Sequence, residues 1–282
     1  MNNENLEFLQ ENLKYLGFGE KQYINQQLSE QIALAPKSFE LDLEAFFDED
    51  HKLEVTLYFR RSDQLDMYFF NKYEARLRSS HDPELDKAQT FYISKGTGVT
   101  LKESFNLLQG RSVNKNLYNM EGVKYNAWIQ LDFSEKDQHN NYKMKQYREQ
   151  YGYDLEKTLE KYPIRELKNI ELRADLIRSL RKGNQHTVSF DKASKTEKMF
   201  IEANPQFKTI NIYSPATRGL RKESPRQEPA AAQAHKGAAR PRPGGKDKKE
   251  WKDEETEEQE EVKEEEAATV GTKQPARRKV HK

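Results

Sequence analysis

Cysteine is absent from all 282 residues of this chain. Without thiols the chain can form no disulfide, no cysteine nucleophile and no thiolate metal site. A composition of this kind is typical of proteins in a reducing compartment, and we expect a cytoplasmic location.

Long hydrophobic runs are also absent. No stretch approaches the roughly 18 consecutive apolar residues of a membrane-spanning helix. The opening MNNENLEFLQENLKYLG lacks the basic start and apolar stretch of a secretion signal. We therefore expect no membrane partner.

Recognisable catalytic patterns are scarce. The six histidines are scattered, with no HExxH or paired spacing for zinc. No GxSxG motif is present to start a serine hydrolase, and no Arg, His-x-x-Arg and Tyr array indicates strand transfer. We name no catalytic residue, no cofactor and no metal ligand, and we expect a protein that is not an enzyme. An enzyme with a dispersed active site stays as an alternative.

Two loops carry weaker signals for ligands. Oxygen-bearing side chains gather at Asp132, Glu135, Asp137 and Asn140, but they lack the EF-hand spacing and its glycine, so a solvated turn is favoured over calcium. The loop 95–100 leads into a helix start, where backbone N–H groups can hold an anion. A tight turn before a capped helix explains that loop better.

Aromatic residues stop abruptly near Ser214. Before it lie Trp128, all the Phe and all the Tyr, whereas Trp251 is the only aromatic residue after it. The segment 214–282 is rich in Pro, Ala, Gly and Glu and cannot bury enough apolar area to offset chain entropy. We expect it to be a disordered, charged tail.

Charge in this tail comes in blocks. Residues 214–249 hold ten Lys and Arg against three acids, 250–266 hold two against eleven, and 267–282 hold five against none. Such blocks predict either a weak nucleic-acid arm that the acidic block screens, or a solubilising tail without a partner. The cations of the first interpretation are Arg221, Lys222, Arg226, Arg240, Arg242, Lys246, Lys248, Lys249, Arg277, Arg278 and Lys279.

The first 98 residues show two periodicities. Leucines at helical spacing with Gly17 after them, then a polar stretch over 20–34, predict a helical hairpin. From Phe39 the period changes to two, which predicts antiparallel strands with one packed face and one solvated face. The strands are expected at Phe39, Leu41, Leu43; Leu53, Val55, Leu57, Phe59; Leu65, Met67, Phe69; and Thr90 to Ser94.

A capping box predicts the next helix, since Thr100 and Glu103 have its spacing and Gly110 stands beyond the end. The alternating strand 123–133 follows and places Trp128 on its polar side. A ring there is either covered by a helix, which we favour, or a contact residue. Two helices, opened at Asp154 and near Asn169, and strands over 186–190, 198–202 and 207–213 complete this region.

The strongest local signal for nucleic acid interleaves cations with aromatic rings, as in single-strand-binding surfaces. An amphipathic strand with packed tyrosines and solvated cations explains the same residues and is favoured. The candidates are Tyr142, Lys143, Lys145, Tyr147, Arg148 and Tyr151, with Tyr153 beyond them.

Six long motifs cover much of the region before the tail: VTLYFRRSDQLDMYFFNKYEARL, GVTLKESFNLLQGRSVNKNL, EGVKYNAWIQLDF, YGYDLEKTLEKYPIREL, LIRSLRKGN and MFIEANPQFKTINIY. Together they resemble a family of largely uncharacterised proteins carried on conjugative transposons and related mobile elements of Bacteroidetes. The resemblance implies a setting, with genes for DNA excision, topoisomerase-like processing and conjugal transfer nearby. It carries over no catalytic residue.

These patterns predict an α+β fold of antiparallel meanders with packed helices. The expected parts are a helical hairpin (1–36), a β-rich module (37–98), an α+β module (99–213) and the charged tail (214–282). The expected function is a non-enzymatic accessory of mobile-element DNA processing, in excision or transfer, with protein partners and weak nucleic-acid contacts. The main alternative is a protein-interaction or regulatory module without nucleic-acid affinity.

Overall fold

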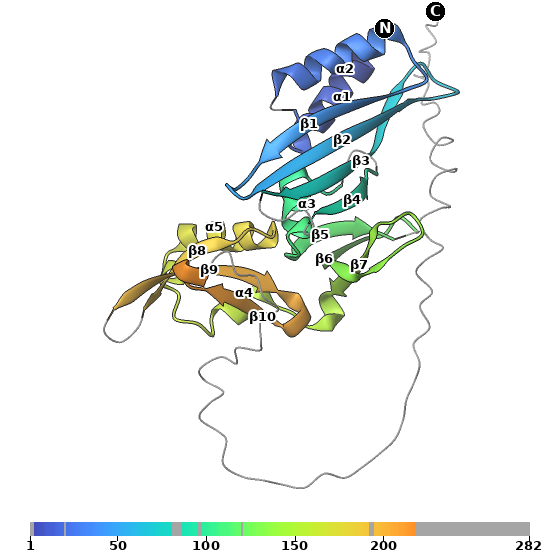
Figure 1. Ribbon diagram of the computed structural model, residues 1–282. Helices are drawn as coiled ribbons and strands as arrows, with labels where there is room; N and C mark the ends of the chain where they lie inside the picture. Colours follow the sequence, from blue (N-terminus) through green and yellow to red (C-terminus); the bar gives the residue numbers. More distant parts are fainter. Residues whose placement is uncertain are drawn as a thin grey trace, which may run out of the picture. The chain divides into compact units, whose positions relative to one another are not determined.

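The computed structural model describes residues 3–19, 21–80, 86–94, 98–119, 121–191 and 195–217 (Figure 1). The α-helices are α1 (Asn3–Tyr15), α2 (Gln22–Leu34), α3 (Leu101–Leu108), α4 (Leu155–Leu159) and α5 (Ile170–Arg181). The strands are β1 (Ser38–Phe46), β2 (His51–Arg61), β3 (Tyr68–Ser79), β4 (Lys87–Tyr92), β5 (Val113–Tyr118), β6 (Lys124–Lys136), β7 (Tyr142–Arg148), β8 (His186–Asp191), β9 (Thr196–Asn204) and β10 (Thr209–Tyr213). Helices with three antiparallel sheets confirm the predicted α+β class.

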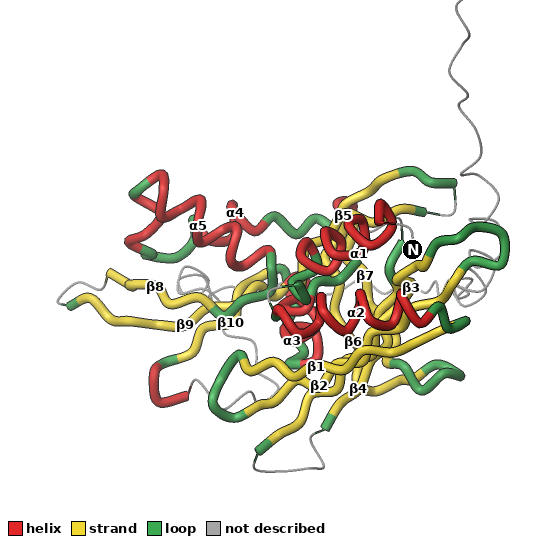
Figure 2. Tube along the Cα trace, turned by 90° about the horizontal axis from the view of Figure 1, so that it is seen from above, coloured by secondary structure: helices red, strands yellow, loops and turns green. Residues whose placement is uncertain are grey.

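Strands β1 to β4 form one sheet in chain order. Every second side chain of β1 and β2 is buried, and Phe39 faces Phe59 as Leu43 faces Val55. Helices α1 and α2 contact the sheet on this apolar face (Figure 2). The alternate positions of β1 are exposed, so the predicted meander with one packed and one solvated face is confirmed.

The third strand differs from the prediction. Leu65 and Phe69 were expected on the packed side of a strand, but they are 39% and 37% exposed. The chain still turns at Leu65, where the Ser62 N–H donates to the Met67 carbonyl at 2.8 Å, and β3 starts only at Tyr68. Successive aromatic residues at 68–70 give no alternation from which to read the phase of the strand.

The predicted helical hairpin is confirmed. Helix α1 ends before Gly17, whose φ of 85° is the left-handed conformation that glycine adopts without strain. Asn5 then fixes α1 to β3, because its Nδ2 donates to the Tyr68 carbonyl at 3.0 Å and its Oδ1 accepts from the Tyr68 N–H at 2.8 Å. The side-chain amide therefore takes the place of a neighbouring strand at the start of β3, where β4 does not pair with it.

The capping box of α3 is also confirmed. The Thr100 hydroxyl accepts from the Glu103 N–H at 3.3 Å, and Glu103 Oε2 accepts from the Thr100 N–H at 2.9 Å. Lys115 adds an ion pair to Glu103 at 2.8 Å. The helix N-terminus is thus occupied by its own carboxylate, which fits the turn interpretation of the preceding loop; residues 95–97 of that loop lie outside the described residues.

The region after α3 holds two three-stranded sheets, ordered β5-β6-β7 and β10-β9-β8. Trp128 of β6 is only 6% exposed and meets the Tyr153 ring edge-on at 5.4 Å between centroids. The ring on the polar side of the predicted strand is therefore covered. The buried residues of this core are Trp128, Tyr147, Leu155, Leu159, Ile164, Leu176, Leu180, Val188, Phe190, Ile201, Ala203 and Ile210.

The helices of this region begin where the sequence predicts. The Asp154 side chain accepts from the Lys157 N–H, and the Asn169 side chain accepts from the N–H groups of the first turn of α5. Gly183 follows α5 with a φ of 77° and lies so close to Val113 and Ser112 that an added Cβ would be 2.8 Å from Val113 Cγ2.

One side-chain amide joins the edges of two sheets. Strand β4 begins at Lys87, earlier than the predicted stretch from Thr90. Its Gln89, which is 5% exposed, accepts from the Tyr142 N–H at 2.8 Å and donates to the Tyr142 carbonyl at 3.4 Å. Beside it the Thr90 N–H donates to Asn141 Oδ1 at 2.8 Å. We call these contacts the Gln89 bridge; they cover the β4 edge where β7 begins.

Among the described residues, 117–119 and 121–125 form a unit apart from the rest. This segment joins the end of β5 to the start of β6 by a turn, in which the Gly122 N–H donates to the Asn119 carbonyl at 2.9 Å. Asn119 Oδ1 also accepts from the Val123 N–H at 2.8 Å. The turn expected before the long strand is therefore present.

Candidate functional site

The predicted nucleic-acid residues 142–148 form strand β7, and their side chains leave it on two faces. Register with β6 pairs Tyr147 with Trp128 and Lys143 with Asp132, so Lys143, Lys145 and Tyr147 share one face. Tyr142 and Arg148 lie on the other face. Each face thus carries one of these rings with at least one cation, while residues adjacent in the sequence lie on opposite faces.

Two of the β7 cations are paired with acids of β6. Lys145 Nζ lies 2.5 Å from Asp132 Oδ2, and Lys143 Nζ lies 2.9 Å from Glu135 Oε2. The Lys145 ammonium, with the Ser134 hydroxyl, lowers the pKa of Asp132 to about 2. Phosphate binding by Lys145 would have to compete with a carboxylate that stays ionised.

The tyrosines of this stretch are fixed by packing. Tyr147 is 9% exposed, and burial raises its pKa to about 12. Its ring lies 5.0 Å from that of Tyr151, whose hydroxyl donates to the Gln206 carbonyl at 2.8 Å. Tyr142 packs edge-on against Phe133 at 4.9 Å. This arrangement matches the amphipathic-strand interpretation.

The tail cations of the predicted nucleic-acid site lie outside the described residues. They are Arg221, Lys222, Arg226, Arg240, Arg242, Lys246, Lys248, Lys249, Arg277, Arg278 and Lys279.

Strand β1 presents a different surface at the edge of the first sheet. Among the described strands it pairs with β2 alone, in an unbroken register of nine residue pairs. The Arg61 N–H donates to the Lys37 carbonyl at 3.0 Å, so the odd-numbered residues exchange hydrogen bonds with β2. The even-numbered residues therefore direct their N–H and C=O groups away from the sheet: Ser38, Glu40, Asp42, Glu44 and Phe46.

The same even-numbered residues also carry the exposed side chains of β1. Three of them, Glu40, Asp42 and Glu44, form what we call the acidic edge. Asp42 Oδ1 accepts from the Thr56 hydroxyl at 2.6 Å, and Glu44 shares the Lys52 ammonium with a carboxylate of β2. Among the described residues, Lys52 is the one cation ion-paired with a side chain of the acidic edge, so the edge strand presents a negative surface.

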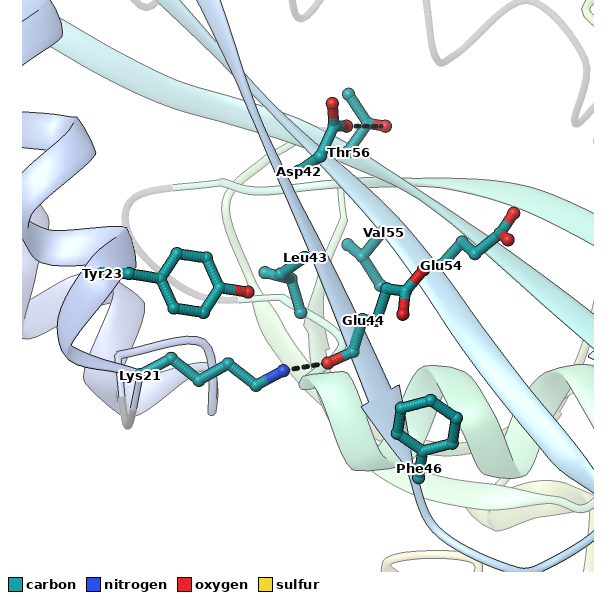
Figure 3. Close-up of a pocket in the computed structure, with 9 residues that line it drawn as sticks. All are labelled: Lys21, Tyr23, Asp42, Leu43, Glu44, Phe46, Glu54, Val55 and Thr56. Atoms are coloured by element: carbon teal, nitrogen blue, oxygen red, sulfur yellow. Dashed lines mark hydrogen bonds between the residues drawn. The ribbon is translucent and has the colours of Figure 1, made fainter.

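A hollow of about 520 Å³ lies beside this edge (Figure 3). Lys21 and Tyr23 line one side of it, and Lys21 Nζ donates to the Glu44 carbonyl. That contact shows that a group from outside the sheet can reach an outward backbone group of β1. Tyr23 and Phe46 are 42% and 67% exposed, so the hollow offers aromatic as well as acidic contacts.

Lys102 is the lysine whose pKa is most changed among the described residues. Burial lowers its pKa to about 8, and Arg111 contributes to the shift. Its ammonium lies 4.2 Å from the ring centroid of Phe47 and 4.6 Å from that of Phe105. Aromatic faces hold this cation in place, and no carboxylate of the described residues forms an ion pair with it.

The described residues hold no group of three or more His, Asp or Glu side chains arranged for a metal ion. The oxygen-rich loop illustrates why: Asp132 binds Lys145, and Asp137 Oδ1 accepts from the N–H groups of His139 and Asn141 at 2.9 and 2.8 Å. These contacts describe a turn closed on its own backbone.

Within the described part of the chain, no helix has both the length and the apolar character needed to cross a membrane. No protein-family model matches the sequence. Searches of curated proteins and of solved structures likewise give no match. The functional argument therefore depends on the geometry above.

Sequence reasoning identified the β7 stretch but missed β1 as a candidate surface. The alternation of acids with apolar residues over 38–46 was visible. The position of this segment at an open edge was not visible, because an edge is defined by which strands pair. Only the three-dimensional register shows that acids and outward backbone groups coincide.

Proposed function

We propose that this chain is a non-enzymatic accessory protein that acts by binding other proteins through the first sheet. The observation that carries the proposal is the exposed side of β1 to β4, where an acidic edge strand with outward backbone groups lies beside exposed aromatic rings. Edge strands and aromatic residues are common elements of protein recognition.

The setting of this binding is mobile-element DNA processing, in excision or transfer. This part of the proposal follows from the resemblance of the long sequence motifs and from nothing else. A role as an adaptor fits it, since such processing assembles several proteins on one DNA.

Nucleic-acid contact is a second, weaker activity in this proposal. The basic blocks 214–249 and 267–282 favour it, whereas the paired cations of β7 argue against a site there. We expect salt-sensitive oligonucleotide binding by the full chain. Replacing Lys143 and Lys145 by Gln should leave the affinity within twofold, while neutralising Arg277, Arg278 and Lys279 should weaken it.

Site-specific photo-crosslinking tests the protein-binding proposal. A benzophenone amino acid replaces Glu74 on the exposed side of β3, and in a matched control it replaces Ala174, which is exposed on α5. In cells that express the chain natively, we expect a covalent protein adduct from position 74 and not from position 174. No adduct at 74, or equal adducts at both positions, would contradict the proposal.

A further inference from the structure

We infer that the acidic edge of β1 binds an extended segment of a partner protein by strand addition, and that the segment carries Lys or Arg at every second residue. The inference deepens the proposed function and rests on it, because it names the partner chemistry of the same sheet.

The backbone of β1 is ready to accept a further strand. Five residues direct both N–H and C=O outward over nine residues of unbroken register. One of these groups, the Glu44 carbonyl, accepts from Lys21 Nζ, and an incoming strand would displace this side chain. Edge strands that avoid such pairing commonly contain a proline, a bulge, an inward charge or charged side chains. The segment 38–46 contains no proline and has no register shift against β2, and its three acids disfavour a partner strand of like charge but not one of opposite charge. The opposite edge of the sheet, β4, is by contrast covered in part by the Gln89 bridge.

The side chains of β1 select the charge of the partner. Backbone direction and side-chain face both alternate with a period of two, so the outward residues are also the acidic ones. An incoming antiparallel strand that bonds to Glu40, Asp42 and Glu44 places three of its own residues directly opposite these carboxylates, on the same face. Opposite charges in such positions stabilise a strand pair, and like charges destabilise it.

The intervening residues of the partner then face the side on which α2 lies, where Tyr23 borders the hollow. Small β-branched residues suit these positions. The recognised pattern is thus a cation, a β-branched residue and a cation again. A segment with the same three cations in one block puts at least one of them on the wrong face.

A second copy of this chain is a poor occupant of the edge. Antiparallel self-pairing centred on Asp42 would set Asp42 against Asp42 and Glu40 against Glu44. Every facing pair within the acidic edge would then join like charges, which disfavours the dimer. A separate partner with complementary charge avoids this repulsion.

The test uses the full chain and two labelled peptides of equal composition, Thr-Lys-Val-Lys-Val-Lys-Thr and Val-Thr-Lys-Lys-Lys-Thr-Val. We expect fluorescence anisotropy to show at least tenfold tighter binding of the alternating peptide. Hydrogen exchange should show new protection at the amides of Glu40, Asp42 and Glu44. The amides of Leu41 and Leu43, already bonded to β2, should not change.

Charge reversal provides the matched control. Glu40→Lys with Asp42→Lys should weaken binding of the alternating peptide at least tenfold, while Glu7→Lys with Glu11→Lys, at exposed positions of α1, should leave it unchanged. Circular dichroism checks that each variant is folded. If a variant does not fold, the exchange pattern of the unaltered chain decides the question alone.

Equal affinity for the two peptides would overturn the inference, since it indicates general charge attraction. Protection at another strand, or no binding of the alternating peptide, would overturn it as well. If these results appear while the crosslinker at position 74 still captures a protein, strand addition is wrong and the proposed function stands. If position 74 also captures nothing, both fail.

Discussion

Strands β1 and β7 each lie at an edge of a sheet, and each carries three side chains of one charge. The acids of β1 project from the residues whose backbone groups point outward. Lysines 143 and 145 of β7 instead pair with acids of the neighbouring strand β6, and the start of β7 is covered by the Gln89 bridge. Similar sequence patterns therefore produce an edge available to a partner in one case and an edge satisfied within the fold in the other.

The contrast between the β1 and β7 edges would be wrong if the β7 tyrosines contacted nucleic acid and did not pack in the core. Tyr147→Ala should lower the free energy of unfolding by about 3 kcal/mol, because it removes a ring that packs against the core of Trp128. Urea unfolding followed by circular dichroism measures the change. Tyr147→Phe, which keeps the ring, should cost less than about 1 kcal/mol. A stable Tyr147→Ala variant that has lost oligonucleotide binding would reverse our interpretation of β7.

The second test removes the Gln89 bridge, so that the covered start of β7 resembles the open edge of β1. Gln89→Ala removes both side-chain contacts with the Tyr142 backbone and leaves those groups without their partner, at a cost of about 2 kcal/mol. Thr56→Ala, which removes one exposed hydrogen bond to Asp42, should cost less than half as much. Equal losses, measured by urea unfolding, would mean that the bridge contributes little to the difference between the edges.

Lys102 lies against aromatic rings, whereas Lys145 of β7 pairs with a carboxylate. The aromatic surroundings of Lys102 predict that the free energy of unfolding changes at alkaline pH. Lys102, stacked on Phe47 just beyond β1, has a folded pKa of about 8, below its ordinary 10.5. The unfolded chain therefore binds more protons between these values, and stability should rise with pH over that range by roughly 1 kcal/mol, allowing for partial exposure. Unfolding at pH 7.5 and 9.5 measures it. Lys102→Met should remove the rise, and a rise that persists would assign it to another group.

The smallest expected effect concerns the ion pair between Lys145 and Asp132. The folded pKa of Asp132 is about 2, against an ordinary 3.8. Ionised Asp132 stabilises the folded state at pH values above its ordinary pKa. This stabilisation is lost as pH falls toward 2, because the native state must then take up a proton. Lys145→Gln should raise the pKa of Asp132 toward 3.8 in an NMR titration, with less than about 1 kcal/mol lost at pH 7. Lys72→Gln, on β3 of the first sheet, should not change the pKa of Asp132, and a shift in that control would indicate a long-range effect.

Much of the fold could be predicted because its signals are local. Alternation of buried and exposed residues located β1 and β2, the spacing of Thr100 and Glu103 located α3, and Gly17 marked the end of α1. The phase of β3 was wrong because its first residues are consecutive aromatics. A register shift between Tyr58 and Phe59 of the paired strand adds an irregularity that no single strand reveals.

The candidate sites were harder to predict because they depend on contacts distant in sequence. Trp128 is covered by residues that follow it by some twenty-five positions and more, such as Tyr153. The acid that holds Lys145 lies on another strand, so β7 looked more basic in the sequence than it is in the fold. The acidic edge likewise required knowledge of which strand lies outermost.

The Gln89 bridge joins residues 53 positions apart in the chain. A ribosome adding about 5 to 20 residues per second needs roughly 3 to 10 s to synthesise that interval. During this time β4 can already pair with β3, while its outer edge still lacks the segment that will cover it. The nascent chain thus carries a second open edge that the finished protein loses, and for a few seconds of each synthesis it is exposed to pairing with other chains.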